Sequence, residues 1–254
     1  MTWTQAICAM LIFGRADLSV QPARISPWFD SNFEPLAQML QRLHAQTHRR
    51  YLKTHTPLDG LPYHAEVTYL AVYRHPLDAF FSAASLATTM AQGTVTPRDG
   101  QSRDVKSFMR AYLTANFTKG LAEQMTIGAL AHHFKGFWDH RDLPNIHLLH
   151  YADLSRDLAG GIRSLGTTLG IDIDDAAARA MASAASFSSM QKDARKFAPE
   201  SNGSWKKPDD FFRGGGSGGW RGVLSEDDIS NYRRILADVL PDTAAARWLE
   251  NGSS

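Results

Sequence analysis

The run EVTYLAVYR, residues 66–74, constrains the fold more than any other part of the sequence. It is β-branched and aromatic with almost no polar interruption, a pattern typical of a strand that is buried on both faces. Pro76 follows closely and is well placed in the first turn of a helix, where Asp78 is also favourable. A buried strand that leads directly into a helix predicts an α/β fold.

Helical and strand patterns alternate along the rest of the chain. We expect helices over residues 3–13, about 32–47, 104–117, 126–140 and 152–171, and short strands over 49–55 and 145–151. The polar segment 92–103 is expected to form a mobile loop. Because strands and helices alternate without a linker, we predict a single domain over residues 1–254. Its fold would be three-layer α/β/α, with a central, mainly parallel sheet and helices on both faces.

The composition gives no sign of a strongly charged partner. Of the 254 residues, 43% are hydrophobic and 21% are charged, and the formal net charge is +1. Such a chain gives no reason to expect nucleic acid or an anionic membrane as a general partner. Any anion site must therefore be local and built from a few placed residues.

The single cysteine, Cys8, excludes an internal disulfide and suits a reducing compartment. It lies in an apolar helical pattern, which indicates a buried structural thiol rather than a nucleophile. The first residues contain a short apolar run but no basic segment and no small-residue cleavage site. No stretch approaches the ~20 apolar residues that span a bilayer. We therefore expect a cytoplasmic protein without a transmembrane segment.

Lys53 and His55 stand two residues apart at the end of the expected strand 49–55. In an extended chain such side chains point to the same face, so both would converge where the strand gives way to a loop. A lysine and a histidine there suit proton transfer and the binding of a developing negative charge. On these residues alone, an ordinary solvated strand end is the simpler interpretation.

Several motifs occur in a fixed order: KTHTPLDGLP, YLAVYRHPLDAFFS, LLHYADL, SFSSM and RGGGSGGWR. Together they resemble the ordered motifs of cytosolic-type sulfotransferases, and the resemblance runs from Thr2 to about Arg221. Enzymes of that family move a sulfuryl group from 3′-phosphoadenosine 5′-phosphosulfate (PAPS) to a hydroxyl or an amine. The resemblance implies a P-loop NTPase-like sulfotransferase fold, PAPS as co-substrate and no metal.

The resemblance implies a 3′-phosphate site that is built around Arg74 and Ser82. Arg74 ends a buried strand, and ligands of open α/β sheets bind at the carboxyl ends of strands, beside helix N-termini that favour anions. An arginine fork and a hydroxyl can hold a phosphate there. Arg213 and Gly215 would contact the same phosphate. Gly214 belongs to this segment too, at a position where the family usually has a lysine.

The resemblance also assigns the catalytic and adenine-binding residues. His55 would be the general base that takes the proton of the acceptor hydroxyl, and Lys53 would hold and polarise the sulfuryl group. The adenine ring needs flat apolar walls and a few edge contacts. The matching residues are the stacking pair Trp3 and Phe187, Tyr151 as hydrogen-bond partner of the base, and Ser186 in the same loop as Phe187.

One family motif is largely missing. Family members carry a phosphosulfate-binding loop, Tyr-Pro-Lys-Ser-Gly-Thr-Thr-Trp, of which only Thr2 and Trp3 have counterparts here. We therefore expect an N-terminally incomplete fold, truncated rather than degenerate, that transfers sulfuryl groups poorly as written. The alternative is a catalytically silent protein that binds PAPS or 3′,5′-ADP. A nucleotide kinase is disfavoured because no Walker Gly-Lys-Ser/Thr is present.

The acceptor cannot be read from the sequence beyond its class, a hydroxyl of a small lipophilic or glycolipid molecule. The family's dimerisation motif is not recognisable after Trp220, so a family-like dimer is not expected and the oligomeric state stays open. His132 and His133 are adjacent on an expected helix and point in different directions. No carboxylate or cysteine accompanies them at ligand spacing, so we expect no metal.

Overall fold

A computed structural model describes residues 1–31, 34–87, 105–118, 125–198, 211–212 and 216–253. The expected loop 92–103 lies outside these ranges. The chain divides into two compact units, Met1–Thr54 with Leu154–Gly215 and His55–Asp153 with Gly216–Ser254. Each unit is described by itself, and the single domain stays a prediction. Within the described ranges, every helix is too short or too polar to cross a membrane.

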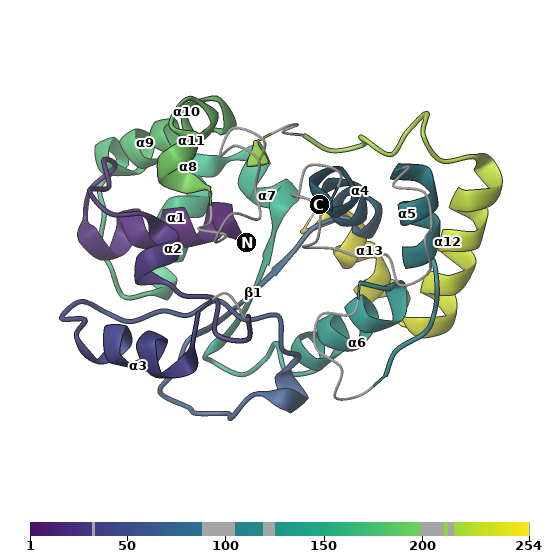
Figure 1. Ribbon diagram of the computed structural model, residues 1–254, viewed down its shortest axis with the longest axis horizontal. Helices are drawn as coiled ribbons and strands as arrows, with labels where there is room; N and C mark the ends of the chain where they lie inside the picture. The colour runs from purple at the N-terminus through teal and green to yellow at the C-terminus, as the bar shows by residue number, and fades with distance from the viewer. Residues whose placement is uncertain (32–33, 88–104, 119–124, 199–210, 213–215, 254) are drawn as a thin grey trace. The chain divides into compact units, whose positions relative to one another are not determined.

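The first unit is helical and is organised around α1 (Figure 1). Helix α1 (Thr2–Phe13) buries most of its length and ends at Gly14, whose φ of 62° lets its N–H reach back to the carbonyls of Leu11 and Met10. The other helices are α2 (Pro22–Ile25), α3 (Leu36–His44), α8 (Leu158–Thr168), α9 (Asp175–Ala184), α10 (Phe187–Lys192) and α11 (Ala194–Phe197).

The second unit contains a parallel sheet, as the sequence predicts. Strand β1 (Tyr69–Tyr73) pairs with β2 (Ile146–His150), and the register places Tyr73 opposite His150. Around the sheet lie η1 (Leu58–Gly60), α4 (Pro76–Ala87), α5 (Val105–Tyr112), α6 (Ile127–Trp138), α12 (Glu226–Val239) and α13 (Thr243–Asn251). Helix α7 (Tyr151–Arg156) starts directly after β2 and crosses from this unit into the other.

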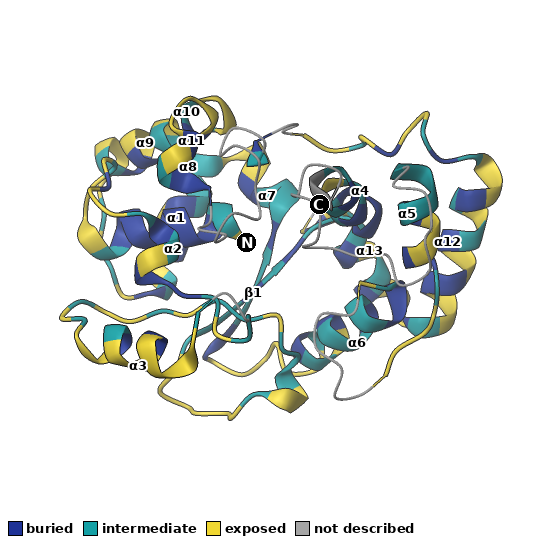
Figure 2. Cartoon of the chain, viewed as in Figure 1, coloured by how far each residue is buried: buried dark blue, intermediate teal, exposed yellow. Residues whose placement is uncertain are grey.

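One face of the sheet supplies part of the core of the second unit. Ala71 and Tyr73 of β1 and Ile146 of β2 join a buried cluster with apolar residues of α4, α5, α6, α12 and α13. The buried residues follow the inner sides of these helices in Figure 2. Ala71 and Tyr73 are buried while Leu70 and Val72 are half-buried, so β1 is fully buried on one face only, whereas its apolar sequence predicts burial on both faces.

Four expectations about elements are wrong in detail. The helix over 104–117 already ends at Tyr112. The strand over 49–55 is reduced to one bridge between Lys53 and Trp28, because Pro27 beside it has no N–H to extend the ladder. The helix over 32–47 begins only at Leu36, since Pro35 is extended. The helix over 152–171 is interrupted at Asp157, whose side chain accepts a hydrogen bond from the Gly160 N–H at 2.8 Å and starts α8.

Candidate functional site

Arg74 and Tyr151 meet at the carboxyl ends of the two strands. Because Tyr73 and His150 are register partners, the residues that follow them leave the sheet side by side. The Arg74 guanidinium lies 4.4 Å from the centre of the Tyr151 ring, within cation–π range. The structure thus brings together two residues that the family motifs assign to the nucleotide.

The guanidinium of Arg74 uses one nitrogen in a hydrogen bond, while another nitrogen is buried without an acceptor among the described residues. Its Nη2 donates a hydrogen bond to the carbonyl oxygen of Gly216. Its Nε is buried and has no hydrogen-bond partner within the described ranges. An unsatisfied buried donor costs about 1–3 kcal/mol, and more when it is charged, so such a group calls for an acceptor. A phosphate oxygen is an acceptor of the right charge.

The start of α4 carries two polar residues that the motif reading missed. His75 Nδ1 accepts a hydrogen bond from the Leu77 N–H at 3.2 Å and so caps the helix. The His75 ring stacks on Trp220, and burial lowers the pKa of this histidine. Asp78 is buried, and its Oδ1 accepts a hydrogen bond from the Gly218 N–H at 2.6 Å. Asp78 and Gly218 are 140 residues apart in the sequence, so no local pattern predicts that they touch.

Ser82 lies further along α4 and is exposed. Asp78 and Ser82 are four residues apart, so they share one face of the helix. That Ser82 shares a ligand with Arg74 stays a prediction. Arg213, Gly214 and Gly215 lie outside the described residues.

In the first unit, Trp3 is hydrogen-bonded to the segment that leads into Ser186 and Phe187. The indole N–H of Trp3 donates a hydrogen bond to the Ala185 carbonyl at 2.7 Å. The next residue, Ser186, caps α10 and accepts a hydrogen bond from the Ser189 N–H. Phe187 is 40% exposed, so its ring is accessible for stacking. Thr2 begins α1.

Lys53 and His55 lie on the two sides of the boundary between the units. The Lys53 ammonium lies 4.1 Å from the centre of the Trp28 ring, and the backbone of Lys53 donates to the Pro27 carbonyl. His55 is exposed. Whether both side chains act on one point stays a prediction.

The remaining candidates have structural partners. Cys8 is buried, as predicted, and burial raises the pKa of its thiol to about 12. His132 Nε2 lies 3.1 Å from Asp59 Oδ1, whereas His133 Nδ1 lies 2.9 Å from the Tyr73 hydroxyl. Within the ranges that the structure covers, no three histidine, cysteine or acidic residues gather as metal ligands would.

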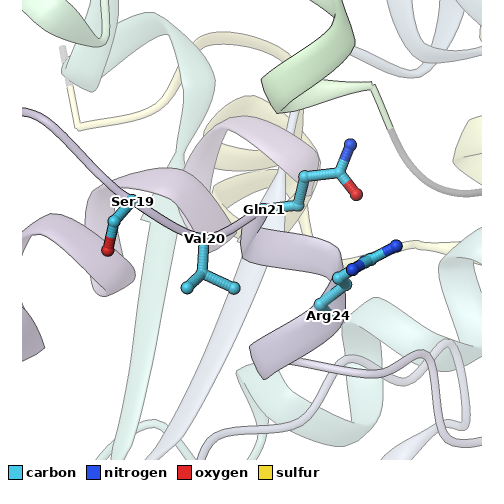
Figure 3. A pocket seen from close by; sticks show the side chains of 4 residues that line it. All are labelled: Ser19, Val20, Gln21 and Arg24. Carbon is cyan, nitrogen blue, oxygen red and sulfur yellow. The ribbon is translucent and has the colours of Figure 1, made fainter.

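A surface hollow lies elsewhere in the first unit, before and within α2. It is lined by Ser19, Val20, Gln21 and Arg24 (Figure 3). None of the residues that the sequence motifs single out is among them. This hollow therefore gives no evidence about the reaction.

Known proteins that are similar to this chain show its family. The model of the sulfotransferase domain family matches residues 1–244. A glycolipid sulfotransferase of Mycobacterium bovis (strain BCG / Pasteur 1173P2) is 33% identical over 282 residues, which cover 99% of this chain and 85% of the relative. A glycolipid sulfotransferase of Mycobacterium tuberculosis (strain ATCC 25177 / H37Ra) is 33% identical over 281 residues, with the same coverage.

A solved structure shares the fold. Retinol dehydratase, in complex with androsterone and the inactive cofactor PAP, superposes with a TM-score of 0.70 at 20% sequence identity. The match covers 95% of this chain and 78% of the other. This likeness confirms the P-loop-like sulfotransferase fold that the motifs predict. With a family match over nearly all of its length, the chain belongs to the sulfotransferase family.

Proposed function

We propose that this protein transfers the sulfuryl group of PAPS to a hydroxyl of a glycolipid or of another small lipophilic alcohol. The main observation in favour of PAPS as sulfuryl donor is Arg74 at the end of β1. Its buried Nε has no hydrogen-bond partner among the described residues, and a phosphate oxygen is a suitable acceptor. The acceptor class is supported by the two mycobacterial relatives, which are named glycolipid sulfotransferases. Because Cys8 is the only cysteine, we also propose a reducing compartment, the cytoplasm.

Donor binding is assigned to the residues that the family motifs name. Arg74, Ser82 and the segment Arg213–Gly215 would hold the 3′-phosphate, which distinguishes PAPS from an ordinary adenine nucleotide. The adenine ring would contact Trp3, Tyr151, Ser186 and Phe187, with Thr2 at the start of the same helix as Trp3. The charge and the unused donor of Arg74 fit a phosphate, and the exposed ring of Phe187 fits an aromatic base.

The transfer step needs one base and one positive charge. His55 would take the proton of the acceptor hydroxyl while the acceptor oxygen forms a bond to sulfur. The bond between sulfur and the phosphate oxygen breaks, and 3′,5′-ADP leaves on the opposite side. Lys53 would stabilise the negative charge that develops on the transferred group. Alignment and charge stabilisation account for the rate in this scheme.

The test is transfer of labelled sulfuryl groups from PAPS to a panel of acceptors. The panel contains glycolipids, the matching free sugars and simple lipophilic alcohols, and each reaction is run with and without the protein. We expect labelled product with the lipid-linked alcohols and little with the free sugars. Tight binding of 3′,5′-ADP without label on any acceptor would contradict the proposed transfer and would support a silent binding protein.

A further inference from the structure

Asp78 places a negative charge where a sulfotransferase binds a negative ligand. Its side chain is buried, with 4% of the residue exposed, and it lies in the first turn of α4. A buried carboxylate close to a phosphate site opposes anion binding, because like charges repel strongly in a low dielectric. Its presence there requires a compensating role.

The contacts of Asp78 indicate that role. Its Oδ1 accepts a hydrogen bond from the N–H of Gly218, whose φ of 85° suits glycine and few other residues. The next residue also packs closely on α4, since a Cβ atom at Gly219 would lie 2.9 Å from the Phe81 ring. The glycine segment 216–219 is thus fixed against α4 by a charged hydrogen bond and by a contact that only glycine allows.

The same segment holds Arg74. The Gly216 carbonyl accepts a hydrogen bond from Arg74 Nη2, and the Tyr151 ring covers a face of the guanidinium. Gly216 and Tyr151 restrict the orientation of the guanidinium, and its buried Nε has no hydrogen-bond partner among the residues that the structure describes. Asp78 anchors the segment two residues beyond Gly216 and so controls the orientation of Arg74 without touching it.

We propose that Asp78 is a positioning residue for 3′-phosphate binding, which it serves by holding the glycine segment 216–219 against α4. The proposal rests on the proposed function, because it takes Arg74 as the 3′-phosphate contact. In this role, Asp78 acts through its carboxylate oxygen, which accepts the hydrogen bond from Gly218, and not through its negative charge. The charge itself weakens anion binding and is the cost of a strong hydrogen bond to Gly218.

Two variants separate the oxygen from the charge. Asp78→Asn keeps an acceptor oxygen and removes the charge, whereas Asp78→Ala removes both. Affinities for 3′,5′-ADP and 5′-AMP are measured by calorimetry for each variant, with the exposed Asp142→Ala as control. We expect Asp78→Ala to lose about tenfold or more in affinity for 3′,5′-ADP, with little change for 5′-AMP. Asp78→Asn should bind 3′,5′-ADP at least as tightly as the wild type.

Steady-state kinetics distinguish a positioning role from a merely structural one, because only positioning changes the KM for PAPS selectively. Asp78→Ala should raise the KM for PAPS and leave kcat at saturating PAPS nearly unchanged. If Asp78→Ala does not fold, Gly218→Ala disturbs the same contact from the other side. Its side chain would be strained at this φ and would meet Arg221 at 2.9 Å, so the same selective loss is expected.

The outcomes distinguish this inference from the proposed function. Equal losses of Asp78→Ala for both nucleotides, or equal weakening in Asp78→Asn and Asp78→Ala, would overturn the positioning role. If Arg74→Ala then still lowers only 3′,5′-ADP affinity, the 3′-phosphate site stands without Asp78. If Arg74→Ala lowers both affinities alike, the assignment of the 3′-phosphate site itself is wrong.

Discussion

His75 combines two environments that favour its neutral form. Its Nδ1 must keep a lone pair to accept the Leu77 N–H, and its ring stacks on Trp220 and Tyr232. Burial lowers its pKa, while the nearby carboxylates of Glu250 and Asp78 oppose that shift. The folded protein therefore binds a proton at His75 more weakly than the unfolded chain does.

The pH dependence of stability follows from this sign. The stabilising effect of neutral His75 is fully present above the unfolded pKa of about 6.5 and is lost as pH falls below it. We expect the Tm to decrease between pH 7.5 and 5.5, and to decrease less in His75→Asn, which keeps a capping side chain without a titrating ring. Thermal denaturation of both proteins across this range measures the difference. Parallel curves would show that His75 does not contribute.

In the proposed mechanism, the transfer chemistry depends most on His55. His55→Ala should reduce the rate of sulfuryl transfer by about 10²–10⁴, the usual effect of losing a general base. The affinity for 3′,5′-ADP should change little, because the base is assigned to the acceptor side. His44→Ala, at an exposed histidine of α3, is the matched control. Normal transfer by His55→Ala would exclude His55 as the base.

We expect Arg74 and Arg213 to decide selectivity for the 3′-phosphate. Each change to alanine should weaken 3′,5′-ADP by roughly 1.5–3 kcal/mol, the size of a hydrogen bond to a charged group, and 5′-AMP much less. Calorimetric titration with the two nucleotides measures this, with the exposed Arg234→Ala as control. A variant that loses both ligands equally has lost something other than the 3′-phosphate contact.

The sequence motifs name individual candidate site residues, but they do not predict the contacts that these residues make. Arg74 and Tyr151 follow from the motifs, and the parallel register explains why they meet. The hydrogen bond from Gly218 to Asp78 joins residues far apart in the chain, so no local pattern contains it. Lys53 likewise lies over Trp28 next to a single backbone bridge between these two residues. The sequence pattern predicts a longer strand there.

At the scale of elements, the second unit relies on the start of α12. Ser225 and Asp228 form a capping box, in which the Ser225 hydroxyl accepts from the Asp228 N–H and the Asp228 carboxylate accepts from the Ser225 N–H. Arg110 of α5 adds a hydrogen bond to Asp228 Oδ1 at 2.8 Å. Mainly because of this arginine, the pKa of Asp228 lies well below its usual value, so its contribution to stability is lost only in strong acid.

Loss of this cap should be measurable without harm to the site. Ser225→Ala should lower the free energy of unfolding by about 1 kcal/mol, because the first turn of α12 loses its side-chain acceptor. Ser230→Ala, at an exposed position of the same helix, should have almost no effect. Urea denaturation of the two variants and the wild type makes the comparison. Equal midpoints for all three would mean that the cap contributes nothing.

Element boundaries are predicted correctly where a single residue is recognised as the end or start of an element. They are wrong where a hydrophobic pattern is extended past such a residue. Gly14 and Pro76 mark the end of α1 and the start of α4, as expected. Pro35 and Asp157 interrupt patterns that looked continuous, since one is held extended and the other caps a new helix. Hydrophobic periodicity gives the type of an element, and its ends depend on single residues.

At the scale of the whole molecule, the two units are linked more closely than separate domains usually are. The chain passes from one unit to the other three times, at residues 54–55, 153–154 and 215–216. The second passage lies inside helix α7. Independent domains are normally joined through exposed, flexible linkers, and a helix that belongs to both units is not such a linker. The single domain stays a prediction, which the unfolding behaviour tests.

We therefore expect the protein to unfold in one cooperative transition. Scanning calorimetry should give a van't Hoff enthalpy equal to the calorimetric enthalpy, because neither unit can unfold without disrupting α7. Addition of 3′,5′-ADP at about 100 times its Kd should stabilise the native state by about 2.7 kcal/mol and move the whole transition to higher temperature. An uninvolved nucleotide such as 5′-CMP at the same concentration is the control. Two resolved transitions, of which only one responds to 3′,5′-ADP, would show two independently stable units, because a single cooperative domain cannot be stabilised in one part alone.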